Sequence, residues 1–318
     1  MKAMSIAEYA EKYGDRPAVQ EGKIRLTETE MPDFLLPKRE PHTHKYSYGR
    51  ALLIAGSRGY SGAPVLAANA CERSGAGLTS LMIPESIYEI AASRCDGTVV
   101  TPLPAAENGD ISLQAKTRVL SALKSADACA IGPGLGPGPE VRELVKLVVR
   151  SAECPLILDA DALTACVEEK NLLETCRAPL LVTPHEGEFR RMGGDLSDGR
   201  LSGALRFALE HPGVLLILKG FGTLVCQGET VSVNPTGSPA MAKGGSGDVL
   251  CGILCALLAQ GFDPSFAAKC AAWLHGAAGD RAAEETGEYS MTPSDIIRAL
   301  PQVFRSLEER GNKGADRQ

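Results

Sequence analysis

Short, continuous apolar runs recur along this chain, and they constrain its fold more than any other feature. They occupy residues 51–55, 78–83, 128–131, 156–158, 180–182 and 214–218. Stretches with helical spacing of apolar residues, such as residues 61–74, separate several of these runs. Runs without polar alternation are typical of strands that are buried on both faces. Their alternation with helices predicts an α/β domain with a mostly parallel central sheet and helices on both faces.

Residues 1–45 differ from the rest of the chain, because they are polar, charged and interrupted by prolines. We expect them to form an N-terminal extension with one short helix near residues 5–13. The apolar pattern begins at Arg50, so we expect one domain over residues 46–310 and a polar tail over residues 311–318. A chain of 318 residues that is 44% hydrophobic can bury the core of such a domain.

Charge and hydropathy exclude several classes of protein. The net charge is −6, and no basic stripe is available for nucleic acid. No apolar run reaches the ~18 residues of a membrane span, and charges stand where a signal peptide needs an apolar core. We therefore expect a cytoplasmic protein without nucleic-acid or membrane partners. The ten cysteines form no CxxC pair and lie in apolar runs, which predicts reduced core thiols.

Polar and glycine-rich loops follow most of the predicted strands, at residues 56–57, 132–136, 159–161, 183–188 and 219–220. Ligands of open parallel sheets bind beyond the carboxyl ends of the strands, so these loops predict one binding site. Asp161 would either cap a helix or contact a ligand. Lys219 would belong either to an ordinary hairpin turn or to a phosphate site. We expect His185 to contact substrate, because loops at strand ends carry function.

A glycine-rich turn, Gly244-Gly245-Ser246-Gly247-Asp248, leads directly into an apolar segment with helical spacing. Glycines adopt backbone angles that other residues avoid, so successive N–H groups can converge on one anion. The helix that follows would place its positive end behind the turn. Asp248 could then accept the proton of a hydroxyl that attacks phosphorus. Lys243 is a further candidate for phosphate binding. A tight turn with an acidic helix start is the alternative without function.

Spacing excludes two other nucleotide motifs. The chain has no Gly-x4-Gly-Lys-Ser/Thr, and residues 132–136 lack the third glycine of the dinucleotide fold. A hydride-transfer enzyme is therefore not expected. We also expect no protein-bound metal, because Cys251 and Cys255 lack paired histidines. His275 and Trp273 lie in an alanine-rich helical segment, which favours packing roles.

Several motifs, in one order along the chain, resemble those of the NAD(P)H-hydrate dehydratases. They lie at residues 49–57, 60–63, 74–78, 132–136, 158–163, 183–188, 218–220, 234–237 and 242–248. The resemblance covers residues 45–305. It implies a ribokinase-like fold and repair of the S form of hydrated NADH or NADPH, in which water has added across the C5–C6 bond of the nicotinamide ring. ADP or ATP would donate the phosphoryl group, with Mg²⁺ accompanying the nucleotide. The donor and the preferred hydrate stay open.

The same resemblance implies roles for single residues. Asp248 would accept the proton of the C6 hydroxyl. The hydrated dinucleotide would contact Ala63, Gly134, Gly136, His185 and Asp248, with the register of Ala63 and the two glycines open by one or two positions. The nucleotide would lie against Lys219, Gly220, Phe221, Gly222, Thr223, Gly244, Gly245, Ser246 and Gly247.

The resemblance also bears on partners. An epimerase that interconverts the two hydrate forms often precedes this domain, but residues 1–45 are too few for it. We therefore expect the epimerase as a separate metabolic partner, or none, and we expect a homo-oligomer, a tetramer. Two alternatives remain. One is a kinase of the same fold that phosphorylates a vitamin-precursor alcohol, and the other is a nucleotide-binding protein without catalysis.

Overall fold

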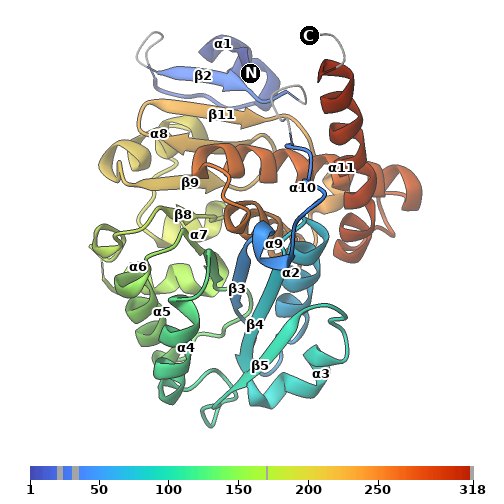
Figure 1. The fold of residues 1–318 in the computed structure, drawn as a ribbon. Helices are drawn as coiled ribbons and strands as arrows, with labels where there is room; N and C mark the ends of the chain where they lie inside the picture. The colour runs from blue at the N-terminus through green and yellow to red at the C-terminus, as the bar shows by residue number, and fades with distance from the viewer. Residues whose placement is uncertain (20–23, 31–35, 170, 316–318) are drawn as a thin grey trace.

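The computed structural model of the chain describes residues 1–19, 24–30, 36–169 and 171–315. Within these residues one sheet has the strand order β1-β2-β11-β10-β9-β8-β7-β6-β3-β4-β5 (Figure 1). The strands are β1 Lys2–Ala3, β2 Arg25–Glu28, β3 Arg50–Ile54, β4 Leu78–Pro84, β5 Val99–Leu103, β6 Ala128–Ile131, β7 Leu156–Leu158, β8 Leu180–Val182, β9 Val214–Leu218, β10 Thr223–Gln227 and β11 Thr230–Asn234. Neighbours from β9 to β5 in this order pair in parallel. The predicted mostly parallel sheet is therefore confirmed.

Helices cover both faces of this sheet, as predicted. They are α1 Ile6–Tyr13, α2 Gly62–Arg73, α3 Tyr88–Ala92, α4 Lys116–Leu123, α5 Pro139–Ser151, α6 Thr164–Glu168, α7 Glu186–Arg191, α8 Arg200–Glu210, α9 Ser246–Ala259, α10 Pro264–Thr286 and α11 Pro293–Ala315. In β3, Leu53 faces the core under α2, α9 and α10, while Leu52 and Ile54 face the core under α5 and α8. Side chains that alternate across a strand can fill two cores only when both faces are covered.

Helix α9 lies at the centre of one core. Nearly all of its side chains are buried, because the helix is apolar on every side and packs against β3, β6, α2 and α10. Its first turn begins at Ser246. The glycine turn is thus anchored to the most buried helix of the domain. No helix in the described part of the chain is long and apolar enough to cross a membrane.

The N-terminal residues extend the sheet. The helix expected near residues 5–13 is confirmed as α1, and Ser5 and Glu8 form a capping box at its start. Strands β1 and β2 were not anticipated. Strand β2 lies beside β11 in the sheet (Figure 1). The two strands pair in parallel, and Arg25 lies opposite Thr230 in the register. The division of the chain at residues 45 and 310 stays a prediction.

Candidate functional site

The ends of β7, β8 and β9 bring three polar side chains together. Asp159 follows β7, Thr183 follows β8 and Lys219 follows β9. The Lys219 Nζ lies 2.8 Å from the Asp159 Oδ1, and the Thr183 hydroxyl donates to the same oxygen at 2.7 Å. Asp159 and Thr183 are each 1% exposed. Three of the five predicted strand-end loops therefore form one polar cluster inside the protein.

Lys219 carries the positive charge of this cluster. Its Nζ also lies 3.7 Å from the Glu188 Oε2. Burial lowers the pKa of Lys219, but the charges of Asp159 and Glu188 outweigh burial, and the net pKa is raised. Lys219 is therefore an ammonium group at neutral pH. A side-chain carbon at Gly247 would lie 3.2 Å from the Lys219 Nζ, so the ammonium lies against the first turn of α9.

The glycine turn precedes α9 as predicted, but its glycines differ. Gly245 has a φ of 100° and is the N-cap residue, whereas Gly244 and Gly247 have no such angle. The Ser246 hydroxyl donates to the Met241 carbonyl at 2.8 Å. The ammonium of Lys243 does not face the turn, because it donates to the Tyr289 and Met291 carbonyls. Lys243, which the sequence suggested as a phosphate-binding residue, is therefore hydrogen-bonded elsewhere.

Asp248 lies in the first turn of α9. Burial is the main cause that raises the pKa of this carboxyl to about 7, and the negative charge of Asp159 raises it further. Lys219 acts in the opposite direction. A carboxyl with this pKa can both bind and release a proton near neutral pH, which is the property that general base catalysis requires.

The two carboxylates of the loop after β7 have different partners. Asp161 does not cap a helix, because its Oδ2 accepts the Gly136 backbone N–H at 2.9 Å. Burial raises the pKa of Asp161, and the charges of Asp110 and Asp159 add to this effect. Ala160 between the two carboxylates has a φ of 47°, a strained angle for a residue with a Cβ.

Ala63 and Gly134 lie against each other. A side-chain carbon at Gly134 would be 3.0 Å from the Ala63 Cβ and 2.9 Å from the Tyr60 Cβ, and the φ of Gly134 is 60°. The Ser57 hydroxyl donates to the Gly134 carbonyl at 2.9 Å. The structure therefore brings these two predicted substrate contacts together, whereas Gly136 donates to Asp161.

His185 is the N-cap residue of α7. Its Nδ1 accepts the backbone N–H groups of Gly187 and Glu188 at 3.0 and 3.2 Å. Because Nδ1 is an acceptor, the proton of the neutral ring lies on Nε2, which is 3.4 Å from the Glu188 Oε1. The ring is largely exposed, so a substrate contact through Nε2 stays a prediction.

The loop of residues 219–223 connects β9 and β10, which pair antiparallel. The hairpin turn considered from the sequence is thus present. The Arg200 guanidinium supports it from behind and donates to the carbonyls of Leu218, Lys219, Phe221 and Gly222. Sequence reasoning missed Arg200, because it lies on α8 without a motif, and it gave Glu188 no role of its own. The position of Glu188 three residues after His185 was the available signal.

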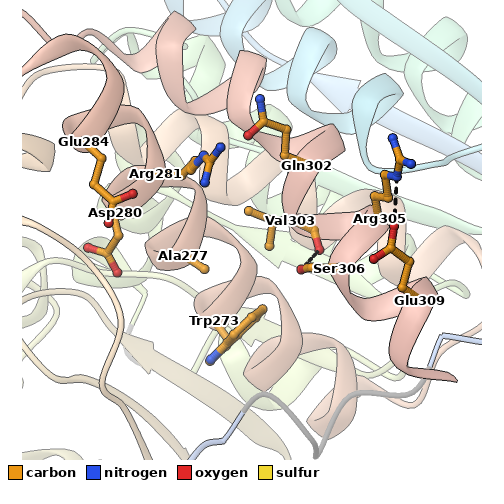
Figure 2. A pocket seen from close by; sticks show the side chains of 10 residues that line it. All are labelled: Trp273, Ala277, Asp280, Arg281, Glu284, Gln302, Val303, Arg305, Ser306 and Glu309. Carbon is orange, nitrogen blue, oxygen red and sulfur yellow. Dashed lines mark hydrogen bonds and ion pairs between the residues drawn. The ribbon is translucent and has the colours of Figure 1, made fainter. Parts of the chain in front are cut away.

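Two further features involve helix α10. His275 on α10 is expected to pack, and burial lowers the pKa of its ring to about 4, so the ring is neutral. Its Nε2 has no hydrogen-bond partner among the described residues. A cavity of 480 Å³ lies between α10 and α11. Figure 2 shows its lining, which is Trp273, Ala277, Asp280, Arg281, Glu284, Gln302, Val303, Arg305, Ser306 and Glu309. None of these residues belongs to the strand-end loops.

Comparisons with known proteins agree on one family. The family model of the NAD(P)H-hydrate dehydratases matches residues 51–302. A bifunctional NAD(P)H-hydrate repair enzyme of Moorella thermoacetica is 41% identical over 86% of this chain, and the match covers 52% of that enzyme. The chain thus spans about half the length of such relatives. An ADP-dependent (S)-NAD(P)H-hydrate dehydratase of Listeria monocytogenes is 33% identical over 86% of this chain and 94% of its own length.

Solved structures give the same result for the fold. A ribokinase-like superfamily protein of Enterococcus faecalis aligns with a TM-score of 0.78 at 26% identity, over 91% of this chain and 98% of that one. An ADP/ATP-dependent NAD(P)H-hydrate dehydratase of Bacillus subtilis, crystallised with ATP and Mg²⁺, aligns with a TM-score of 0.74 at 32% identity, over 86% and 95%. The expected ribokinase-like fold is confirmed.

Proposed function

This chain belongs to the NAD(P)H-hydrate dehydratase family, and from that premise we propose that it dehydrates the S form of hydrated NADH or NADPH. ADP or ATP donates its terminal phosphoryl group to the C6 oxygen and is released as AMP or ADP, and elimination of phosphate restores the dihydronicotinamide ring. The relatives named for this reaction, which use ADP or ATP, support the proposal. The product is the intact reduced dinucleotide, so the reaction is a lyase reaction that repairs a damaged metabolite.

The observation that carries the proposal is the environment of Asp248. Its pKa is raised to about 7, and it stands in the first turn of a helix beside the Lys219 ammonium. A base with this pKa accepts the hydroxyl proton as the C6 oxygen attacks phosphorus. A helix N-terminus and an ammonium are together an anion site, so the transferring phosphoryl group lies within reach of that base.

The reaction follows from these groups. Hydroxide is a poor leaving group, whereas phosphate is a good one. Asp248 takes up the proton of the C6 hydroxyl, and the C6 oxygen carries the phosphoryl group. The lone pair of the ring nitrogen then expels phosphate. Loss of a proton from C5 then restores the C5–C6 double bond. The protein holds the two substrates in line, stabilises the phosphate charge and supplies one weak base.

Binding roles complete the proposal. The donor nucleotide lies against the loop of residues 219–223 and the turn of residues 244–247, where the ammonium and the backbone N–H groups attract phosphate. The hydrated dinucleotide contacts Ala63, Gly134 or Gly136, and His185.

The proposal includes Mg²⁺ with the nucleotide. No group of three or more metal-binding side chains is preformed in the described parts of the chain, but Mg²⁺ on a nucleotide needs only one or two carboxylates. Asp161 fits this need, because burial and the neighbouring charges of Asp110 and Asp159 raise its pKa, and a cation would relieve that repulsion. The ion would neutralise phosphate charge.

The assembly and the metabolic partner are also proposals. We infer that the protein forms a homo-oligomer, a tetramer. Light scattering of the purified protein would measure the mass of this assembly. The bifunctional relatives support an epimerase as the partner activity. Addition of an epimerase should therefore allow the R form of the hydrate to be consumed as well.

One assay tests the proposed activity. The protein is incubated with the S form of hydrated NADH, Mg²⁺ and either ADP or ATP, and the absorbance of regenerated NADH is followed. We expect regeneration with release of inorganic phosphate, and none without nucleotide. Accumulation of a stable phosphorylated hydrate would indicate a kinase instead. Nucleotide binding without any turnover would indicate a binding protein.

A further inference from the structure

Three aromatic rings form a series from the N-terminal helix to the loop after β9. Tyr9 on α1 is completely buried, and its ring centroid lies 5.2 Å from that of Tyr13. The Tyr13 ring lies 5.4 Å from that of Phe221. The Phe221 side chain is 71% exposed. The series thus ends in an aromatic ring that solvent can reach, within the loop of residues 219–223.

Tyr13 also determines how this loop is packed. Gly222 has a φ of 63°, and the Tyr13 ring occupies the space that a side chain at Gly222 would need. The Tyr13 hydroxyl donates to the Glu28 Oε2 at 3.1 Å, which connects the ring to β2. The ring is therefore held on one side by the extended sheet and on the other by the loop.

A second connection runs through Asp15. Its carboxylate accepts the backbone N–H groups of Arg200 and Leu201 at 3.0 and 2.9 Å, and thereby caps α8. The side chain of the same Arg200 donates to the carbonyls of the loop. The N-terminal segment therefore contacts the loop directly through Tyr13 and indirectly through Arg200.

We propose that the N-terminal segment of residues 9–15 completes the nucleotide site. The exposed face of Phe221 stacks on the purine base of the phosphoryl donor, and Tyr13 is the positioning residue that supports Phe221. The inference rests on the proposed function, because it assumes that the loop binds nucleotide. An aromatic ring that is already fixed by a neighbouring ring loses little conformational entropy when a base stacks on it. Lys219 at the start of the loop faces the phosphate site, whereas Phe221 in its middle faces solvent. One short loop thus offers a cation for phosphate and an aromatic face for the base.

Calorimetric titration with two probes tests this inference. ADP carries both base and phosphates, whereas inorganic pyrophosphate carries phosphates alone. Phe221→Leu keeps apolar bulk but removes the aromatic face, and it should weaken ADP binding about ten-fold while leaving pyrophosphate binding unchanged. Tyr13→Ala should weaken ADP binding in the same selective way, and Tyr13→Phe should restore it, because the ring rather than the hydroxyl supports Phe221. Tyr289→Leu, which changes an aromatic residue that is 99% exposed elsewhere, is the matched control.

The outcomes separate this inference from the proposed function. Wild-type protein that binds neither ADP nor ATP would overturn both. Wild-type protein that binds ADP, with equal affinity in Phe221→Leu, would overturn the inference alone, as would an equal loss of ADP and pyrophosphate binding in that variant. Thermal unfolding of each variant is measured alongside. If Tyr13→Ala does not fold, Phe221→Leu decides the test, because its exposed ring contributes little to the core.

Discussion

The ammonium of Lys219 lies 2.8 Å from the carboxylate of Asp159, across the intervening strand β8. Only 17% of the Lys219 side chain and 2% of the Asp159 side chain is exposed. Removing two charges from water is unfavourable, and a buried pair is seldom retained for stability alone. Here the pair holds a cation against the first turn of α9 beside Asp248, where the proposed reaction transfers a phosphoryl group.

Replacement of Lys219 should weaken binding of the nucleotide more than binding of the hydrate. We expect Lys219→Met to raise the KM for ADP or ATP more than the KM for hydrated NADH, because phosphate loses its positive partner. The variant also leaves Asp159 unpaired, which costs about 3–5 kcal/mol of folding free energy. The double variant Lys219→Met with Asp159→Asn should recover stability without recovering nucleotide affinity. Equal effects on both KM values would place Lys219 in another role.

Two cysteines near the turn should be dispensable for catalysis. Cys251 and Cys255 on α9 are completely buried, and all ten cysteines of the chain are free thiols. Burial is the main cause that raises the pKa of Cys251, which therefore carries no thiolate at neutral pH. Replacing both cysteines with alanine should leave turnover largely intact and lower the unfolding free energy by roughly 1–3 kcal/mol through lost packing. Metal analysis of both proteins accompanies the assay, and loss of bound metal together with activity would contradict this view.

Much of the sheet could be predicted because its central strands are short and wholly apolar. Strands β6, β7, β8 and β9 have the predicted bounds. Strand β11 alternates polar and apolar residues, and β5 contains Pro102, so neither matches the pattern of a buried run. In β2, Leu26 is the only apolar residue, and its pairing with β11 depends on backbone hydrogen bonds that composition does not reveal.

One part of the candidate site could be predicted from the sequence, and another part could not. The glycine turn and Asp248 are adjacent in sequence, so a local pattern was sufficient to predict them. Asp159 and Lys219 are 60 positions apart, and they meet only because β7, β8 and β9 are neighbours in the sheet. Strand order is a property of the whole fold. The support that Tyr13 gives to the loop after β9 depends on the same order, because β2 follows β11 at that edge.

The pH dependence of the reaction should report Asp248. Its carboxyl must be ionised to accept a proton, and its pKa is raised to about 7. We therefore expect kcat/KM to fall about ten-fold for each pH unit below that value and to level off above it. Initial rates measured from about pH 5.5 to about pH 8.5 would show this limb. A flat profile across neutral pH would mean that Asp248 does not act as the base or does not have this pKa.

The stability of the protein should depend on the same group. The folded pKa of Asp248 lies above its ordinary value of 3.8, so the folded state binds more protons than the unfolded state between about pH 4 and about pH 7. Its contribution to stability is present at low pH and is lost as pH rises through this window. Asp248→Asn removes the charge, so the variant should gain stability relative to wild type at pH 8 but not at pH 4, on the order of 1–3 kcal/mol. Urea unfolding at both pH values measures this, and an equal difference at both would exclude the raised pKa.

The same substitution should abolish dehydration while preserving nucleotide binding. Asparagine keeps the size of Asp248 and its place in the first turn of α9, so the fold should persist. The amide cannot take up the hydroxyl proton during phosphoryl transfer, and loss of a general base lowers the rate on the order of 10²–10⁴-fold. Removal of a negative charge beside bound phosphate should tighten nucleotide binding slightly, because like-charge repulsion falls. Turnover of hydrated NADH is measured next to a nucleotide titration for both proteins. If the variant retains more than about a tenth of wild-type turnover with unchanged nucleotide affinity, another group accepts the proton.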